Sequence, residues 1–409
     1  MRVPKGLTGL PRETYVLALV AFCVALGFGI VAPAVPLFAL EFGVGTTAAG
    51  AVVSAFALMR LVSGLASGRL VDRVGERTAL FTGLAVVAVS SVFAGLAVSY
   101  PQLLVLRGLG GVGSAVFTIA ATSLLLRVAA AAQRGQTQSV YRGGFLLGGI
   151  VGPALGGAVV GASLRAPFFL YAGTLTLAAV VAATMLPRRL AAGEAEPPAS
   201  GPGVDDASPA AGEAGPPATT LGQALRTPAY QAALAGNFAV GFSLLGVRFT
   251  VLPLLVVQQL DLAPGWIGAA FTVGALVQAV LLLPAGRAVD QLGRRETLVA
   301  GGLLTAVSLV LLAVATGPVS LLLAVTVFAA GAALLGVAPA AVVGDVVQGR
   351  SGTAVAVWQM ASDLGSVIGP LAAGLLIDRA SFSAALGVSA AVVAACAVLG
   401  LRVPARART

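Results

Sequence analysis

The sequence predicts an all-α membrane protein with twelve transmembrane helices arranged as two pseudo-symmetric six-helix bundles. Three observations favour this fold: an apolar composition, long apolar runs that recur along the chain, and an internal repeat. The 409 residues are 58% hydrophobic and 10% charged, and the mean hydropathy is +1.00. A soluble domain carries about 25% charged residues. We therefore expect the lipid bilayer to be the solvent of this chain.

The apolar runs are each about 20 residues long, which is the length of a membrane-spanning helix. The first run follows Arg2 and Lys5, as the core of a signal peptide would, but it is too long and contains Pro33 and Pro36. We interpret it as a retained first helix. The expected spans are 14–40, 46–68, 78–99, 101–126, 138–162, 166–186, 229–256, 263–286, 297–316, 318–342, 353–377 and 381–402.

The repeat relates the two halves of the chain. Gly68–Leu80 reads GRLVDRVGERTAL, and Gly286–Leu298 reads GRAVDQLGRRETL at an offset of 218 residues. A parallel duplication is expected when two six-helix halves are related by an axis along the membrane normal. Other landmarks match at an offset of 217: Pro36 with Pro253, and Gly152-Pro153 with Gly369-Pro370.

We expect an N-terminal bundle over residues 1–187 and a C-terminal bundle over 229–409. Residues 188–228 between them are rich in Ala, Pro and Gly and cannot bury enough apolar area to order themselves. This composition predicts a disordered cytoplasmic linker. A regulatory site in the linker is the alternative.

Arginine placement predicts the orientation. An even number of spans puts both termini on one side, and most basic residues lie in the loops of that side, whereas the opposite loops hold Arg165 and Arg379. By the positive-inside rule, both termini are cytoplasmic in a multi-pass inner-membrane protein. The net charge of +9 is thus explained by topology, because a nucleic-acid patch would cluster in one segment. We expect no nucleic-acid partner.

The composition also argues against catalysis. The chain has no histidine, and its two cysteines, Cys23 and Cys396, lie in apolar runs. Zinc-ligand clusters and Ser–His arrangements are therefore not expected. We expect no metal, no cofactor and no enzymatic activity. No phosphate-binding loop of the Gly-x-x-x-x-Gly-Lys-Ser/Thr type is present, so a proton gradient is the default energy source.

Four motifs lie in corresponding places on this helical plan. They are Leu26-Gly27 followed by Pro33 and Pro36; Gly68-x-Leu70-Val71-Asp72-Arg73-x-Gly75-x-Arg77; Leu103 through Arg107 with Gly111-x-Gly113; and Gly148-x-x-x-Gly152-Pro153-x-x-Gly156-Gly157. Outside the linker and the tails, the chain resembles the major facilitator superfamily, most closely its twelve-helix drug–proton antiporter branch. It departs from that branch at Glu76, where a basic residue is usual, and at Gly110, where glutamine is common.

The motif after the second span is a candidate conformational latch. Its two glycines permit backbone angles denied to other residues in a loop of about ten residues, and Asp72 can lie against a helix N-terminus or an arginine. The resemblance implies that Asp72 holds the cytoplasmic side shut against the second half. A solvated polar turn is the alternative. The latch residues are Gly68, Asp72, Arg73, Gly75, Arg77 and, in the second copy, Asp290.

The fifth-span motif is a candidate helix-packing surface. Its glycines at 148, 152 and 156 share one helix face, Gly157 adjoins them, and Pro153 kinks the segment. A stripe of glycines lets another helix approach closely. The resemblance implies that this helix packs against one from the other half and moves during transport. Ordinary helix packing is the alternative.

Five ionisable residues fall within spans, where charges are costly and often functional: Arg60, Arg107, Arg142, Arg248 and Asp363. Asp363 is the expected proton carrier, and a permanent ion pair with an arginine is its alternative. Arg107 matches the family's helix-4 arginine, which the resemblance associates with proton transfer or cavity polarity. A hydrogen bond to backbone carbonyls is its alternative. Arg142 is expected to reach the cytoplasmic interface.

We expect a central cavity with a net positive interior, which would attract anionic or zwitterionic substrates. The first span has no acidic residue before Glu41, although the resemblance to cationic-drug antiporters implies one there. The candidate lining residues are Arg60, Arg248, Phe28, Phe56, Tyr141, Gln278, Trp358 and Gln359.

Together these features predict a secondary active transporter. We expect a monomeric, proton-coupled antiporter that exports a drug-like compound or small organic metabolite by rocker-switch alternating access. The alternative is an importer or facilitator of an anionic small metabolite. A channel and an intramembrane enzyme fit the duplicated, histidine-free chain less well. Heavy use of Ala, Val and Arg indicates a GC-rich bacterial source.

Overall fold

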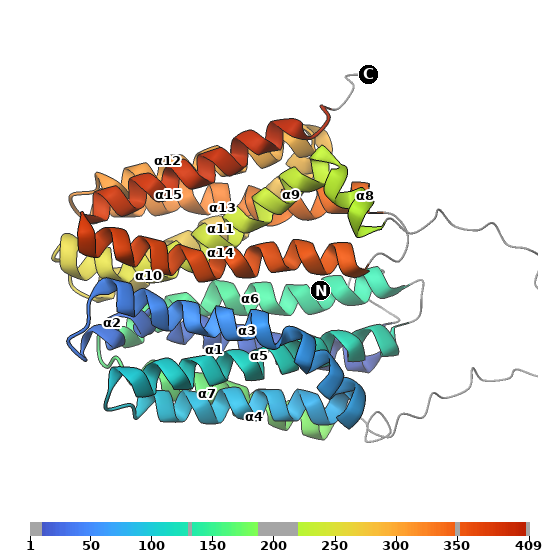
Figure 1. Ribbon diagram of the computed structural model, residues 1–409. Coiled ribbons are helices and arrows are strands. Elements are labelled where there is room, and N and C mark those ends of the chain that lie inside the picture. Colours follow the sequence, from blue (N-terminus) through green and yellow to red (C-terminus); the bar gives the residue numbers. More distant parts are fainter. Residues whose placement is uncertain (1–9, 130–132, 187–219, 348–351, 406–409) are drawn as a thin grey trace, which may run out of the picture.

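The computed structural model describes residues 10–129, 133–186, 220–347 and 352–405 (Figure 1). Within these residues, twelve helical segments are long and apolar enough to cross a membrane. The expectation of twelve spans in an all-α membrane protein is therefore confirmed.

The first half supplies six of these spans. The first span is interrupted at Pro33, because proline lacks the N–H that an unbroken helix needs. It consists of α1 (Arg12–Val31) and α2 (Ala34–Leu40), and it is followed by α3 (Thr46–Val74), α4 (Glu76–Gly95), α5 (Tyr100–Val128), α6 (Arg134–Val160) and α7 (Ala166–Met185).

The second half supplies the other six. Its first span is a composite of α9 (Pro228–Ala239), η3 (Val240–Val247), α10 (Arg248–Leu254) and η4 (Leu255–Gln259), in which η3 and η4 are π-helical. The sequence pattern gave no sign of these π-helical turns. The remaining elements are α11 (Gly265–Gln291), α12 (Arg294–Ala313), α13 (Pro318–Val346), α14 (Gly352–Arg379), α15 (Phe382–Leu399) and the short η5 (Gly400–Arg402).

The linker was expected to be disordered over residues 188–228. Its last part is instead helical. Helix α8 (Leu221–Arg226) begins with a capping box. Gln223 N–H donates to Oγ1 of Thr220 at 3.3 Å, and Thr220 N–H donates to Oε1 of Gln223 at 2.9 Å. These reciprocal bonds stabilise a short helix without a large apolar core. The rest of the linker, residues 188–219, lies outside the described residues.

The two halves lie side by side with their helices roughly aligned (Figure 1). They repeat the same packing: α6 lies against α1 in the first half, and α14 lies against α9 and η3 in the second. A methyl group on Gly148 would overlap the carbonyl oxygen of Phe22, and one on Gly365, 217 residues later, would overlap that of Phe238. The duplication read from the sequence is therefore also a duplication of helix contacts.

The repeated turns are shorter than expected. Helix α3 continues through Gly68 to Val74, and α4 starts at Glu76, so Gly75 alone separates them. Gly75 has φ 82°, and its counterpart Gly293 has φ 114°. These left-handed angles favour glycine. The prediction of a loop of about ten residues from Gly68 was wrong, because α3 continues to Val74 and one sharp turn at Gly75 is enough.

The molecule has two ends. We call the end that carries the Gly75 and Gly293 turns, together with the start of α1 and η5, the terminal end. The other is the opposite end, where the α2–α3 and α14–α15 connections lie. The halves are joined at the opposite end, where Thr46 and Thr47 at the start of α3 bind Asp378 near the end of α14.

Candidate transport cavity

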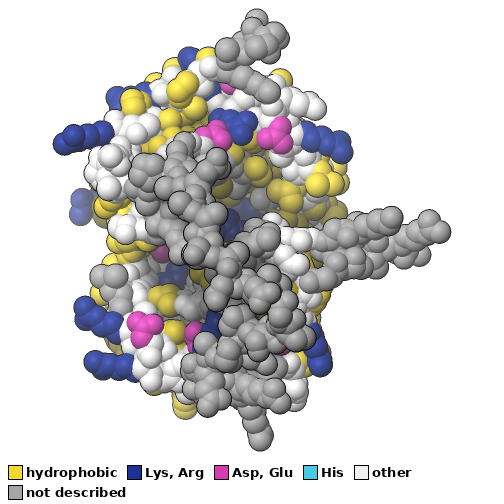
Figure 2. All heavy atoms as spheres, turned by 90° about the vertical axis from the view of Figure 1, so that its right-hand side faces the viewer, with side chains coloured by type: hydrophobic (Ala, Val, Ile, Leu, Met, Phe, Trp, Pro, Cys, Tyr) yellow, Lys and Arg dark blue, Asp and Glu magenta, His cyan; other side chains and the backbone are white. Residues whose placement is uncertain are grey.

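A cavity of about 550 Å³ lies between the two halves. Side chains of α1, α3, α5, α6 and α7 line it from the first half, and those of η3, α10, α11 and α14 line it from the second. Figure 2 looks onto the terminal end, where the surface is hollowed between the halves and basic side chains are visible inside. A space of this volume can hold a drug-sized molecule.

An ion pair joins the two halves beside the cavity. The guanidinium of Arg60 on α3 donates a hydrogen bond to the carboxylate of Asp363 on α14. The two side chains are 33% and 22% exposed. Asp363 is thus placed against an arginine, which was one of the two alternatives expected for it. The pair lies across the surface along which the halves would separate.

Arg107 is a buried cation in the cavity wall. The residue is 5% exposed, and its guanidinium carbon lies 4.7 Å from the ring centroid of Phe56. Its buried Nε has no hydrogen-bond partner among the described residues. The ring face of Phe56 offsets part of the cost of burying the charge.

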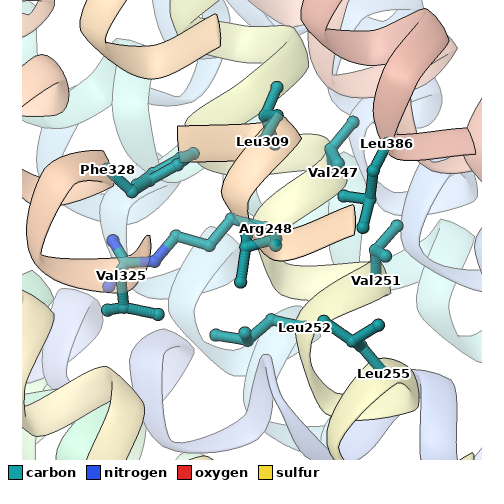
Figure 3. A pocket seen from close by; sticks show the side chains of 10 residues that line it. Val247, Arg248, Val251, Leu252, Leu255, Leu309, Val325, Phe328 and Leu386 are labelled. Atoms are coloured by element: carbon teal, nitrogen blue, oxygen red, sulfur yellow. The ribbon is translucent and has the colours of Figure 1, made fainter. Parts of the chain in front are cut away.

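Arg248 is the corresponding cation of the second half, at the junction of η3 and α10. Its guanidinium carbon lies 5.0 Å and 5.4 Å from the centroids of Phe271 and Phe328. Figure 3 shows the side chain extending towards Val325 and Phe328 among apolar neighbours. Gly274 makes room for it, since a methyl group there would lie 2.8 Å from a terminal guanidinium nitrogen. π-Helical turns such as η3 are frequent at functional sites.

Aromatic rings connect these two cations across the middle of the cavity. Phe28 lies 5.7 Å from Phe56 and 6.4 Å from Phe249, measured between ring centroids. Phe249 stacks on Phe271 at 5.4 Å with an interplanar angle of 15°. Aromatic rings therefore line the cavity between one arginine of each half.

Five of the eight expected lining residues are gathered at this cavity, together with Arg107: Phe28, Phe56, Arg60, Arg248 and Gln278. Three are not. Tyr141 is buried against Phe145, Trp358 belongs to a separate core cluster of the second half, and Gln359 is exposed. Their polar groups did not reveal which face of their helices meets the cavity.

Arg142, which was expected to reach the cytoplasmic interface, is exposed and lines the cavity. Sequence reasoning also missed Phe145, Phe249 and Tyr171, which line it as well. A signal for α6 was available: Arg142, Phe145, Leu146, Gly149 and Pro153 recur at intervals of three and four. They form the face that the glycine stripe leaves free.

That glycine stripe packs within its own half. Methyl groups on Gly148, Gly152 and Gly156 would overlap carbonyl oxygens of α1. For these three glycines the alternative of ordinary helix packing therefore holds. Helix α6 does meet the second half, but through Gly157, whose added methyl group would overlap Gly268 of α11.

The candidate latch residues lie at the terminal end. Asp72, Arg73 and Asp290 are exposed. Arg77 donates a hydrogen bond to the carbonyl oxygen of Ala183 at 3.1 Å, which ties α4 to α7 within the first half. The neighbouring Glu76 pairs with Arg127 at 3.0 Å.

The opposite end is closed by a carboxylate at a helix N-terminus. Asp378 accepts hydrogen bonds from the backbone N–H groups of Thr46 and Thr47 at 2.9 and 2.8 Å, and from their hydroxyls at 2.5 and 2.6 Å. A carboxylate is favoured there because the first N–H groups of a helix lack partners within it. Deeper in, Ser54 donates to the carbonyl oxygen of Val367 at 2.6 Å.

No group of three His, Cys, Asp or Glu side chains among the described residues could hold a metal ion. The cavity offers cationic and aromatic side chains, and the Asp363 carboxylate lies beside it on Arg60.

Comparison with known proteins identifies related chains. The sequence profile described as Major Facilitator Superfamily matches residues 17–263 and 238–409. Multidrug resistance protein 2 of Bacillus subtilis (strain 168) is 26% identical over 362 residues, covering 87% of this chain and 86% of the relative. Quinolone resistance protein NorA of Staphylococcus aureus (strain MRSA252) is 27% identical over 179 residues, covering 43% of this chain and 45% of NorA.

Solved structures share the fold. A mutant of the peptide transporter POT superposes with a TM-score of 0.76 at 16% identity, covering 97% of this chain and 95% of that one. A bacterial homologue of the human lysosomal transporter Spinster, solved in an inward-facing and unoccupied conformation, gives a TM-score of 0.67 at 17% identity, with 96% and 93% covered.

Proposed function

Because this chain belongs to the Major Facilitator Superfamily and is a membrane transporter, we propose that it is a proton-coupled antiporter. It exports drug-like compounds or small organic metabolites by rocker-switch alternating access, as a monomer. The relatives named for multidrug and quinolone resistance support export. The observation that carries the mechanism is the cavity between the halves, crossed at its edge by the Arg60–Asp363 pair.

The orientation proposed for the chain follows from its arginines. The terminal end carries the basic turns and both ends of the described chain, and the opposite end carries Arg165 and Arg379. The positive-inside rule then makes the terminal end cytoplasmic. The described conformation is closed at the opposite end and hollowed at the terminal end, as expected for the state that loads an exported compound.

Asp363 is the proposed proton carrier. While it is ionised, its bond to Arg60 holds α14 of the second half against α3 of the first. Protonation would remove the charge attraction and weaken this link between the halves. A proton arriving from outside would thereby change the balance between the two conformations.

Asp72 is the proposed latch for the other state. It lies exposed in the last turn of α3 at the terminal end. When the terminal end closes, this carboxylate would approach the second half, and a contact made in only one conformation favours that conformation. Gly68, Arg73, Gly75, Arg77 and the second-half Asp290 support the two turns that must approach each other.

The test uses inverted vesicles with an acidic lumen. An exchanger moves protons out when substrate is added, so the lumen becomes more alkaline. In Asp363→Asn, pH-driven uptake is expected to fall by about tenfold or more, while substrate–substrate exchange persists. Asp345→Asn is the matched control, because Asp345 forms an exposed ion pair with Arg294 away from the cavity. Full pH-driven uptake in Asp363→Asn would refute the coupling role.

The basic cavity supports a second candidate, an importer or facilitator of an anionic metabolite. A proton-coupled importer moves substrate and protons in the same direction. The same vesicles then acidify on substrate addition, and a facilitator leaves the lumen pH unchanged. The sign of the pH change therefore separates the candidates.

A further inference from the structure

The charges around the cavity are unbalanced. Four arginines line it: Arg60, Arg107, Arg142 and Arg248. No Asp or Glu lines it among the described residues, and the nearby carboxylate of Asp363 is already bonded to Arg60. Among the described residues, no ion pair joins the other three arginines to a carboxylate. The potential in the cavity is therefore positive, whatever compound enters.

Arg107 and Arg248 are held in an unusual way for buried cations. Aromatic ring faces, rather than carboxylates, lie against both guanidinium groups. Their buried Nε atoms have no hydrogen-bond partner among the described residues. A guanidinium has five N–H donors, and donors without partners are costly in a poorly hydrated site. An anionic ligand group in the cavity would accept hydrogen bonds from the terminal nitrogens of these guanidinium groups, rather than from the enclosed Nε atoms.

The surface between these two arginines is apolar and aromatic, and its rings are inclined to one another by 41° to 78°. Phe56, Phe28 and Phe249 follow one another at ring-centroid distances of 5.7 and 6.4 Å, and Tyr171 lies 6.4 Å from Phe28. Rings spaced in this way can hold an aromatic ligand by stacking or edge contacts. Uncharged polar residues line the same cavity: Ser114, Thr118, Gln278 and Ser366.

We propose that the cavity selects amphipathic organic anions, that is, aromatic or polycyclic compounds bearing a carboxylate or sulfonate group. The acidic group binds Arg107 or Arg248, and the apolar body packs on the phenylalanine row. An organic cation of the same shape lacks a free carboxylate partner and meets like charge instead. This inference rests on the proposed transport function, since it names the substrate class of the same cavity.

The closing experiment measures binding to the full chain in uncharged phosphatidylcholine nanodiscs, with empty nanodiscs subtracted. Three probes share one aromatic body: pyrenebutanoate, pyrenebutanol and pyrenylbutyl-trimethylammonium. The anion is expected to bind about tenfold tighter than the cation, since a charge-assisted hydrogen bond contributes at least one decade of affinity. The affinity for the alcohol should lie between the other two, and added salt should weaken the binding of the anion alone.

Variants identify the residues responsible. At least one of Arg107→Gln and Arg248→Gln is expected to weaken the binding of pyrenebutanoate by about tenfold, and both should weaken the binding of pyrenebutanol by less than about twofold. Arg226→Gln is the control. Arg226 is exposed at the end of α8, so this substitution removes the same charge outside the cavity. Equal or tighter binding of the cation by the unaltered chain overturns the proposal, whether or not a variant folds. Unchanged anion binding in both variants also overturns it.

Transport of the same probes separates this inference from the proposed function. If the cation is exchanged for protons and the anion does not bind, the antiport proposal stands and the substrate class is wrong. If the anion binds through the two arginines but moves without protons, the substrate class stands and proton coupling is wrong.

Discussion

Two ion pairs show how single residues have diverged between the halves. Glu76 at the start of α4 pairs with Arg127 at the end of α5, and Arg294 at the start of α12 pairs with Asp345 at the end of α13. Both pairs join residues 51 apart, and the charges are exchanged. An acidic residue at position 76 is unusual in the family that this chain resembles. Here it is matched by a basic residue, Arg127, at the position that faces it.

This exchange can be tested at the same two positions. Glu76→Arg would place two arginines together and is expected to lower the unfolding free energy by about 0.2–1 kcal/mol, as for other exposed pairs. Adding Arg127→Glu restores an opposite-charge pair and should recover the loss. Thermal unfolding in detergent measures both changes. A double variant no more stable than Glu76→Arg would show that the pair contributes nothing.

At the scale of helices, glycines set how closely α6 approaches α1. A methyl group on Gly148 would overlap the backbone of α1, whereas nothing lies within 4 Å of one on Gly143. In the second half, Gly365 has the same relation to α9. Close helix approach through small residues is a main source of packing energy in membranes. The stripe is therefore a structural feature of each half.

Matched alanine substitutions follow from this contrast. Gly148→Ala and Gly365→Ala are each expected to destabilise the protein by about 1–3 kcal/mol through overpacking. Gly143→Ala should be neutral or slightly stabilising, because alanine is the better helix former. Midpoints of thermal unfolding in one detergent provide the comparison. Equal midpoints for the Gly143 and Gly148 variants would contradict the packing described for α1 and α6.

At the scale of the whole molecule, the two ends are held by different means. The Asp378 carboxylate bridges the halves at the opposite end by four hydrogen bonds to the start of α3. The residue 217 positions earlier is Gly161, so the first half has no equivalent carboxylate. The bridge formed by Asp378 therefore has no counterpart at the equivalent position of the first half. It must break if the opposite end opens.

Removing this bridge should shift the conformational balance. Asp378→Ala is expected to expose a cysteine placed at Ser54, which is 2% exposed and bonded to Val367 in the closed state. A membrane-impermeant maleimide is added on the side of the membrane that the opposite end faces, and the labelling rate should rise several-fold. The reason is that a contact made in one conformation alone favours that conformation. Arg379→Ala is the neighbouring control. An unchanged labelling rate would mean that Asp378 does not hold this end shut.

The sequence by itself determined the helical plan. Apolar runs of spanning length, together with the offset of 217 to 218 residues, were sufficient for twelve spans in two halves, because lipid requires each span to satisfy its own backbone hydrogen bonds. Intramembrane charge likewise indicated Arg60, Arg107 and Arg248, since charges are kept out of lipid unless they meet a cavity or a partner.

Only the tertiary structure decided which faces meet. It joined Arg60 to Asp363 across 303 residues, placed Arg142 in the cavity, and left Trp358 and Gln359 outside it. In lipid, an apolar face can meet either tails or another helix at similar cost. Hydropathy therefore locates a helix in the membrane without fixing its rotation, and the rotation determines which side chains reach the cavity.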